Sequence, residues 1–247
     1  MWEVVIPSGS DPSGSAPSGS APSGSAGTPV APRSGIGPIE GDALAGWIDD
    51  WQPEDPPLQI ARQRAAEVGV GAVDAASGAT LRLLATAAKA RHIIEVGTGA
   101  GVSTLWLLRG MRPDGVLTSV DAEPEHQRLA KISIAEAGVP TGRARLIGGR
   151  ALQVLPRLSD AAYDLMFCDA NRAENLDYLD AAMRLLRPGG MVVFAGALAG
   201  GRVADPSARD ADIVALRELA RVVRDEPRLL TAAVPVGQGL LVACLAP

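Results

Sequence analysis

The sequence predicts an α/β fold in which a doubly wound, mostly parallel sheet ends in an antiparallel hairpin. Apolar strand-like runs alternate with helical runs over residues 92–195, a pattern typical of parallel strands joined by right-handed crossovers. A glycine-rich turn over residues 97–101 follows the first of these runs. Two apolar runs on either side of Gly237-Gln238-Gly239 then close the chain as a hairpin, so one of these strands runs antiparallel.

The composition fits a folded domain preceded by a low-complexity tail. The chain has 247 residues, of which 47% are hydrophobic and 21% charged, as suits one soluble domain with a well-formed core. Residues 7–26 repeat Pro-Ser-Gly-Ser four times, and this composition cannot bury enough apolar area to offset the entropy of ordering it. We therefore predict a disordered tail over residues 1–37 and the folded domain over residues 38–247.

Each element follows from local periodicity and from its breakers. Helical apolar spacing predicts helices at 41–48 and 77–90, and Pro56 and Pro57 suit the first turn of another at 56–70. Strands are then expected at 92–96, 116–121, 143–148, 163–168 and 190–195. Further helices are expected at 102–110, 124–137, 150–157, 173–186 and 208–225. The final hairpin uses residues 228–234 and 240–244.

Charge and cysteine usage exclude several classes of partner and site. The net charge is −5 with no basic stripe, so we expect no nucleic-acid partner. The sequence contains no uninterrupted run of about 18 apolar residues, so we expect no membrane span. The first residues lack the basic and apolar regions of a secretory signal, so we expect a cytoplasmic protein. Cys168 and Cys244 lie in apolar runs and are interpreted as buried thiols in a reducing compartment, not as a disulfide or metal pair.

The strand at 92–96, the glycine turn and the following helix together predict a nucleotide-type cofactor site. Glycines have no Cβ atom to hold a ligand away from the backbone, and the free N–H groups of the helix start point toward such a ligand. Glu95 lies in an otherwise apolar strand, where an ionised carboxylate needs a partner such as a cationic ligand. Asp121 ends the next strand, where it can accept hydrogen bonds from both ribose hydroxyls of an adenosine.

The choice of cofactor depends on the pattern of the turn. The dinucleotide fingerprint Gly-x-Gly-x-x-Gly fails because Val102 stands at its sixth position. Asp121 does not separate the two cofactors, since dehydrogenases place an acid similarly. Glu95, the failed fingerprint and the closing hairpin favour S-adenosylmethionine over NAD.

Further motifs in order along the chain carry a family resemblance over about residues 65–245. They are Glu95-Val96-Gly97-Thr98-Gly99-Ala100-Gly101-Val102-Ser103-Thr104-Leu105, Val120-Asp121, Gly149-Arg150-Ala151, Asp164-Leu165-Met166-Phe167-Cys168-Asp169-Ala170, Leu186-Arg187-Pro188-Gly189-Gly190 and Gly200-Gly201-Arg202-Val203-Ala204-Asp205-Pro206. The set resembles the catechol / caffeoyl-CoA O-methyltransferase family, and most closely its short actinobacterial members. The resemblance implies a class I methyltransferase (Rossmann-like) fold and O-methylation of a small-molecule hydroxyl, and relatives are commonly homodimers.

The resemblance also implies a set of site residues. The cofactor contacts would be Val73, Glu95, Gly97, Thr98, Ser103, Asp121, Ala122, Ala151 and Asn171. Asp169 would be the catalytic residue, at the junction of cofactor and acceptor. Two alternatives stay open, because Val73 can instead be a core residue and Ser103 can instead cap the helix that it begins.

The family uses a divalent cation, which chelates two acceptor oxygens and lowers the pKa of the hydroxyl. Its ligands correspond to Asp169 and to an Asp-Asn pair that falls here on Ala195 and Gly196, neither of which can ligate through a side chain. Asn171 and Asp205 could add oxygens, but a hard cation prefers about six. We therefore predict no dedicated metal ligands and disfavour a magnesium cofactor.

Other departures from the family lie near this gap. The usual Asp-Ala-Asp-Lys motif reads Asp169-Ala170-Asn171-Arg172, and an arginine stays protonated and cannot act as a base. Arg172 either pairs with an acidic acceptor or is a surface arginine at a helix start. Ala199 replaces an aromatic residue that would form one wall of an acceptor pocket.

Several interpretations remain open at this point. The chain is interpreted as an S-adenosylmethionine-dependent O-methyltransferase with weak or no metal dependence. The alternatives are a non-catalytic S-adenosylmethionine-binding protein and an NAD-linked oxidoreductase. Trp47 and Trp51 lie either in a homodimer interface or packed on the sheet.

Overall fold

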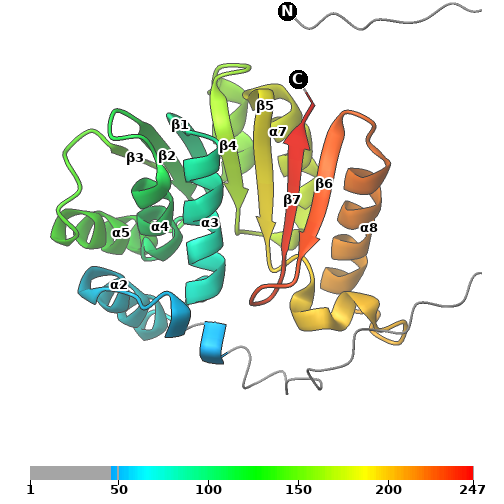
Figure 1. The fold of residues 1–247 in the computed structure, drawn as a ribbon, viewed down its shortest axis with the longest axis horizontal. Helices are drawn as coiled ribbons and strands as arrows, with labels where there is room; N and C mark the ends of the chain where they lie inside the picture. Colours follow the sequence, from blue (N-terminus) through cyan, green and yellow to red (C-terminus); the bar gives the residue numbers. More distant parts are fainter. Residues whose placement is uncertain (1–45, 49, 247) are drawn as a thin grey trace, which may run out of the picture. The chain divides into compact units, whose positions relative to one another are not determined.

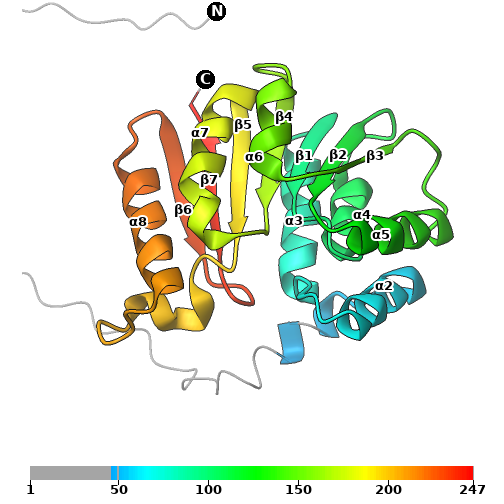
Figure 2. The ribbon, with the colours of Figure 1, turned by 180° about the vertical axis from the view of Figure 1, so that it is seen from behind.

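The computed structural model describes residues 46–48 and 50–246, which contain a seven-stranded sheet with helices on both faces (Figures 1 and 2). The strand order is β3-β2-β1-β4-β5-β7-β6. The strands are β1 (His92–Val96), β2 (Val116–Asp121), β3 (Ala144–Gly148), β4 (Tyr163–Cys168), β5 (Leu186–Ala195), β6 (Leu229–Val234) and β7 (Leu240–Leu245). Strands β1 to β5 pair in parallel, whereas β7 pairs antiparallel with both β5 and β6. The predicted fold class is confirmed.

The helices divide between the two faces of the sheet. One face is covered by α3 (Ala75–Ala87), α4 (Val102–Gly110) and α5 (Pro124–Glu136), and α2 (Pro56–Glu67) packs on α4 and α5. The other packs against α6 (Ala151–Val154), α7 (Asn175–Leu185) and α8 (Ala211–Asp225), and short 3₁₀ turns lie at η1 (Leu155–Arg157), η2 (Arg172–Glu174) and η3 (Ala199–Ala204). Alternate strand residues face opposite layers: Ile93 belongs to the same buried cluster as Leu105 of α4, whereas its neighbour Ile94 belongs to the cluster of Leu179 of α7.

Two helices begin at residues other than those predicted, because carboxylates cap them. The Asp74 side chain accepts a hydrogen bond from the Ser77 backbone N–H at 2.7 Å, so α3 begins at Ala75 and not at residue 77. The Asp210 side chain accepts one from Ile213, so α8 begins at Ala211 and not at residue 208. The sequence contains both caps, but periodicity alone does not locate them.

The segment between α7 and the core of β5 also differs from the prediction. The chain is already paired as a strand at Leu186, opposite Tyr163, where a helix was predicted to end. Leu165 then pairs with Met191, so a bulge accommodates the intervening residues. The predicted helix at 150–157 splits into α6 and η1, because Pro156 lacks the N–H that a longer helix needs.

The first predicted helix lies only partly within the described residues. Residues 46–48 and 50–51 are helical there, and the predicted tail over residues 1–37 lies outside the described residues. Trp47 and Trp51 are 59% and 72% exposed, and their rings contact each other at a tilt, with centroids 5.0 Å apart. This exposure contradicts the alternative in which the two tryptophans pack on the sheet. Across the described part of the chain, no helix has the length and apolar character that a membrane span requires.

Candidate functional site

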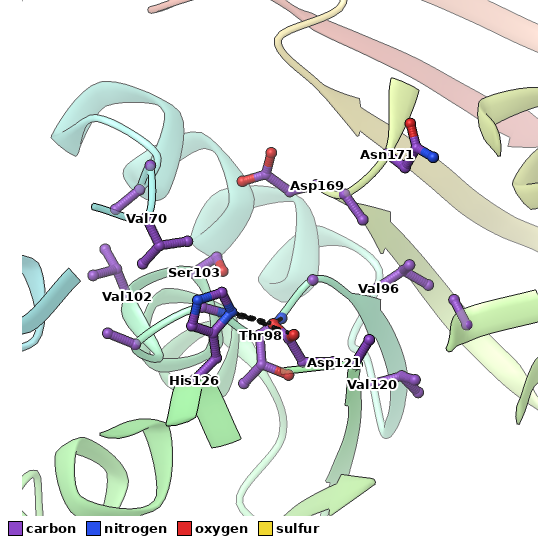
Figure 3. A pocket seen from close by; sticks show the side chains of 18 of the residues that line it. Val70, Val96, Thr98, Val102, Ser103, Val120, Asp121, His126, Asp169 and Asn171 are labelled. Atoms are coloured by element: carbon purple, nitrogen blue, oxygen red, sulfur yellow. Dashed lines mark hydrogen bonds and ion pairs between the residues drawn. The ribbon is translucent and has the colours of Figure 1, made fainter. Parts of the chain in front are cut away.

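A cavity of about 330 Å³ opens beyond the carboxyl ends of β1, β2 and β4 (Figure 3). Ligands of open α/β sheets bind at this edge. Every predicted site residue except Glu95 lines the cavity, namely Val73, Gly97, Thr98, Ser103, Asp121, Ala122, Ala151, Asp169 and Asn171. The structure therefore brings together residues from five separate segments, one before α3 and one after each of β1, β2, β3 and β4.

The glycine turn brings the ends of β1 and β4 into direct contact. Gly97 adopts a φ of +93°, and a Cβ atom there would lie 2.1 Å from the backbone oxygen of Asp169. The Asp169 N–H donates to the carbonyl of Val96 at 2.8 Å. Only glycine allows this approach, so the turn fixes Asp169 relative to the cofactor loop.

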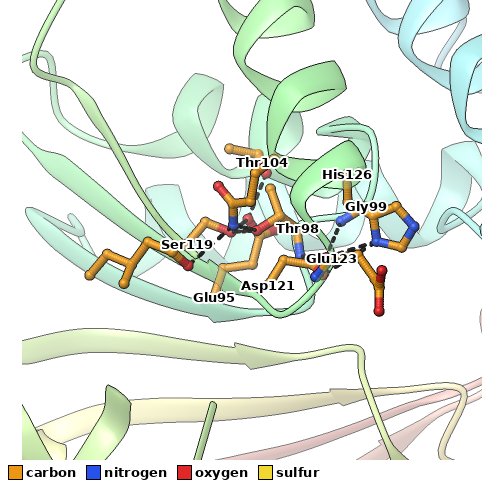
Figure 4. Close-up of polar contacts among 10 residues, drawn as sticks. Glu95, Thr98, Gly99, Thr104, Ser119, Asp121, Glu123 and His126 are labelled. Atoms are coloured by element: carbon orange, nitrogen blue, oxygen red, sulfur yellow. Dashed lines mark hydrogen bonds and ion pairs between the residues drawn. The ribbon is translucent and has the colours of Figure 1, made fainter. Parts of the chain in front are cut away.

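Asp121 is held in place by the same turn (Figure 4). Its Oδ2 accepts hydrogen bonds from the backbone N–H groups of Thr98 and Gly99, both at 3.0 Å. Its Oδ1 accepts from the N–H of Glu123 at 2.9 Å, and His126 Nδ1 lies 3.2 Å from Oδ2. The carboxylate is thus fixed at the cavity edge by the backbone around it.

Glu95 lies beneath the cavity and does not line it. Its side chain is fully buried and accepts hydrogen bonds from three hydroxyls. Thr104 and Ser119 donate at 2.6 Å each (Figure 4), and Ser103 donates at 2.7 Å. Burial raises the pKa of Glu95 to about 7, although the three hydroxyls act in the opposite direction and the charge of Asp169 adds to the increase. The Ser103 side chain links Glu95 to the cavity, since Ser103 does line it.

Asp169 and Asn171 follow β4 and lie across the cavity from Thr98, Asp121 and His126 (Figure 3). The surface of Asp169 opens into this cavity, and its enclosure by the protein raises the pKa of the carboxyl to about 6, whereas Arg172 acts to lower it. The Asn171 side chain accepts from the N–H of Ala173 at 3.1 Å and so caps η2.

Sequence reasoning missed several lining residues. Val70 and His126 line the cavity, as do Glu174 and Tyr178, whose hydroxyl donates to Glu174 at 2.6 Å. His126 stands in the first turn of the helix after Asp121, a position that could have indicated it. Tyr178 gave no such signal, because its place on α7 matches that of an ordinary core residue.

The end of β5 carries no ligating side chain. Gly196 has a φ of +62°, and a Cβ atom there would lie 3.1 Å from Nη2 of Arg172. Asp205 Oδ1 accepts from the N–H and the hydroxyl of Ser207, at 2.8 and 2.7 Å. Within residues 46–48 and 50–246, no three His, Cys, Asp or Glu side chains form a group that could hold a metal ion. The donor set around Asp169 therefore does not fit a divalent cation.

Comparison with known proteins identifies the family. A model of the O-methyltransferase family matches residues 59–245. A protein of Mycobacteroides abscessus whose name assigns it to the O-methyltransferases is 54% identical over 206 residues, which cover 83% of this chain and 95% of that protein.

Two solved structures share the fold and contain S-adenosylmethionine or its demethylated product. The O-methyltransferase TomG of Streptomyces achromogenes, in complex with S-adenosylmethionine, is 31% identical with a TM-score of 0.76, and the match covers 85% of this chain and 100% of TomG. An O-methyltransferase of Bacillus cereus, in complex with S-adenosylhomocysteine, is 28% identical with a TM-score of 0.74, over 82% of this chain and 97% of that one. The family resemblance predicted from the sequence is thus confirmed: the chain belongs to the O-methyltransferase family.

Proposed function

We propose that this chain is an S-adenosylmethionine-dependent O-methyltransferase that acts on a small-molecule hydroxyl. The observation that carries the proposal is the cavity between Asp121 and Asp169, built on the Gly97 turn. Family membership and the cofactors bound by TomG and the Bacillus cereus enzyme support it. Neither an NAD-linked oxidoreductase nor a non-catalytic binding protein is favoured by these relatives.

In the proposed arrangement, the Asp121 carboxylate accepts hydrogen bonds from the ribose hydroxyls, and Ala122 and Ala151 lie beside the adenine. Ser103 and Gly97 contact the amino-acid part of the cofactor, and Val73 contributes an apolar wall. Glu95 has a positioning role in this proposal, because its carboxylate holds the Ser103 hydroxyl at 2.7 Å and does not line the cavity. Asn171 closes the cavity beside Asp169.

The reaction is an in-line displacement, for which the cofactor supplies a methyl group on a sulfonium. The chain has to hold the acceptor oxygen close to that methyl and favour loss of its proton. Asp169 faces the cavity and is the carboxylate best placed to accept a hydrogen bond from the acceptor hydroxyl. Because its pKa is about 6, Asp169 is ionised and able to accept this bond at neutral pH.

Asp121→Asn tests the proposed cofactor site. An amide removes the charge and one acceptor, so we expect affinity for S-adenosylhomocysteine to fall by about tenfold or more, as for a lost charge-assisted hydrogen bond. Isothermal titration calorimetry with S-adenosylhomocysteine and with NADH measures this directly. Asp180→Asn is the matched control, because Asp180 is exposed on α7 and outside the cavity. Binding of NADH in place of S-adenosylhomocysteine by the unmodified protein would reject the proposal.

Three finer expectations extend this proposal. They are a homodimer, a cytoplasmic location and the lack of a nucleic-acid partner, and all three stay predictions from the sequence. The exposed pair Trp47 and Trp51 is the surface that we assign to the homodimer. Sedimentation of the protein and of Trp51→Ser would test the homodimer, since only the variant should then be monomeric.

A further inference from the structure

The Arg172 side chain lies against the end of β5, next to residues 195 and 196, onto which the family resemblance places metal ligands. Measured from an ideal Cβ at Gly196, Nη2 lies at 3.1 Å, Cζ at 3.9 Å and Nε at 4.0 Å. A side chain at residue 196 would therefore meet the guanidinium. In this chain the guanidinium, and not a residue of β5, occupies that space.

Two neighbours fix this position of Arg172. Asn171 caps η2 through the N–H of Ala173, which sets the direction in which the chain leaves β4. Asp212, in the first turn of α8, accepts from Nη1 at 3.1 Å. Among the described residues the Arg172 side chain makes no other hydrogen bond, so Nε and Nη2 can still donate to a ligand.

The backbone at the end of β5 is compatible with a ligating residue at position 196. Gly196 has a φ of +62°, a left-handed conformation that asparagine adopts more readily than most residues. This segment differs from the family pattern in its side chains, because Ala195, Gly196 and Ala199 present only methyl groups or hydrogens. The positive charge beside this segment comes from Arg172, which also acts to lower the pKa of Asp169.

Resting on the methyltransferase function proposed above, we propose that the Arg172 guanidinium takes the place of a divalent cation and binds an acceptor that carries a carboxylate beside its hydroxyl. A guanidinium is permanently charged and planar, and it binds two carboxylate oxygens through parallel hydrogen bonds. It cannot coordinate a hydroxyl oxygen as a Lewis acid, so a neutral diol gains less from it than an acidic acceptor does.

The methyl-transfer step balances without a metal. The acceptor oxygen forms a bond to the methyl carbon as the bond from that carbon to sulfur breaks, and the electron pair of the broken bond stays on sulfur. The hydroxyl proton passes to Asp169 and from there to water. The products are the methyl ether of the acceptor and uncharged S-adenosylhomocysteine sulfur, and no oxidant or reductant takes part.

A pair of probes with the same shape tests the charge of the acceptor. Salicylate has a hydroxyl beside a carboxylate, and salicylamide has the same hydroxyl beside a neutral amide. Both are titrated into protein saturated with S-adenosylhomocysteine in the presence of EDTA. We expect salicylate to bind about tenfold tighter than salicylamide, as expected for a charge-assisted bidentate pair.

Variants at Arg172 show which side chain produces this preference. Arg172→Ala should abolish it and Arg172→Lys should keep part of it, whereas Arg221→Ala, on the distant part of α8, should leave it unchanged. Equal or undetectable binding of the two probes to the unmodified protein would overturn the inference. Saturation with S-adenosylhomocysteine is measured first, so a failure of the cofactor site is distinguished from a failure at Arg172.

A second measurement tests the space that the guanidinium occupies. Ala195→Asp with Gly196→Asn restores the family's ligand types, but Arg172 still lies against residue 196. We expect this double variant to bind Mn²⁺ at least about tenfold more weakly than the triple variant that adds Arg172→Ala, because the guanidinium repels the cation and fills its place. Calorimetry with Mn²⁺ alone compares them, with Arg172→Ala as the control. Equal affinities, or no binding by either, would contradict the proposed replacement.

Discussion

Glu95 is a carboxyl group enclosed by three hydroxyls, and its ionisation links stability to pH. Its pKa is about 7 in the folded protein against 4.5 for the free group. Between these two pH values the folded chain retains a proton that the unfolded chain releases, so the free energy of unfolding falls as the pH rises from 4.5 to 7. At 1.36 kcal/mol per pH unit this loss amounts to about 3 kcal/mol.

Glu95→Gln removes the titrating group while its amide can still bond to the hydroxyls. We expect the variant to lack this loss, so its free energy of unfolding relative to the unmodified protein rises by about 3 kcal/mol between pH 4.5 and pH 8. Urea denaturation at several pH values measures the difference. The same pH dependence in both proteins would show that Glu95 does not titrate in this range.

The turn between β1 and α4 is the element on which the site depends. Gly97→Ala would place a methyl group 2.1 Å from the Asp169 carbonyl, in addition to the strain of a φ of +93°. Gly138→Ala is a matched control, since Gly138 has a φ of +69° but no atom within 4 Å of an added Cβ. The control isolates the backbone strain, which costs about 1–2 kcal/mol.

We expect Gly97→Ala to lower the free energy of unfolding by at least about 2 kcal/mol more than Gly138→Ala does, because overpacking against backbone is added to the strain. We also expect it to weaken binding of S-adenosylhomocysteine, which Gly138→Ala should leave unchanged. Urea denaturation and calorimetry measure the two effects. Similar losses of stability in both variants would mean that β1 and β4 are not in close contact at this turn.

The presence of each helix and strand was predicted from the sequence more accurately than the residues at which it begins and ends. Apolar runs that alternate with helical runs predicted every strand of the described residues, because a buried strand needs apolar residues that can be recognised in the sequence. The bulge in β5 was not predicted, since it depends on how Leu186 pairs with Tyr163 on another strand. The starts of α3 and α8 shifted because the Asp74 and Asp210 caps are side-chain contacts that periodicity does not encode.

The place of the cavity in the molecule was predictable from the ends of the strands, whereas tertiary contacts determine which side chains line it. Glu95 was predicted to touch the cofactor, but hydroxyls from α4 and β2 meet it below the cavity only once the chain is folded. The contact between Arg172 and Gly196 joins residues that are distant in sequence, and the anchor Asp212 comes from yet another helix. Such convergence has no local signal.

A crystal structure of the protein with S-adenosylhomocysteine tests the central claim most directly. We predict that the ribose lies within hydrogen-bonding distance of Asp121, that the adenine lies beside Ala151, and that the sulfur faces Asp169. Density for the ligand outside this cavity, or an orientation that leaves Asp121 without contact to the ribose, would contradict the account.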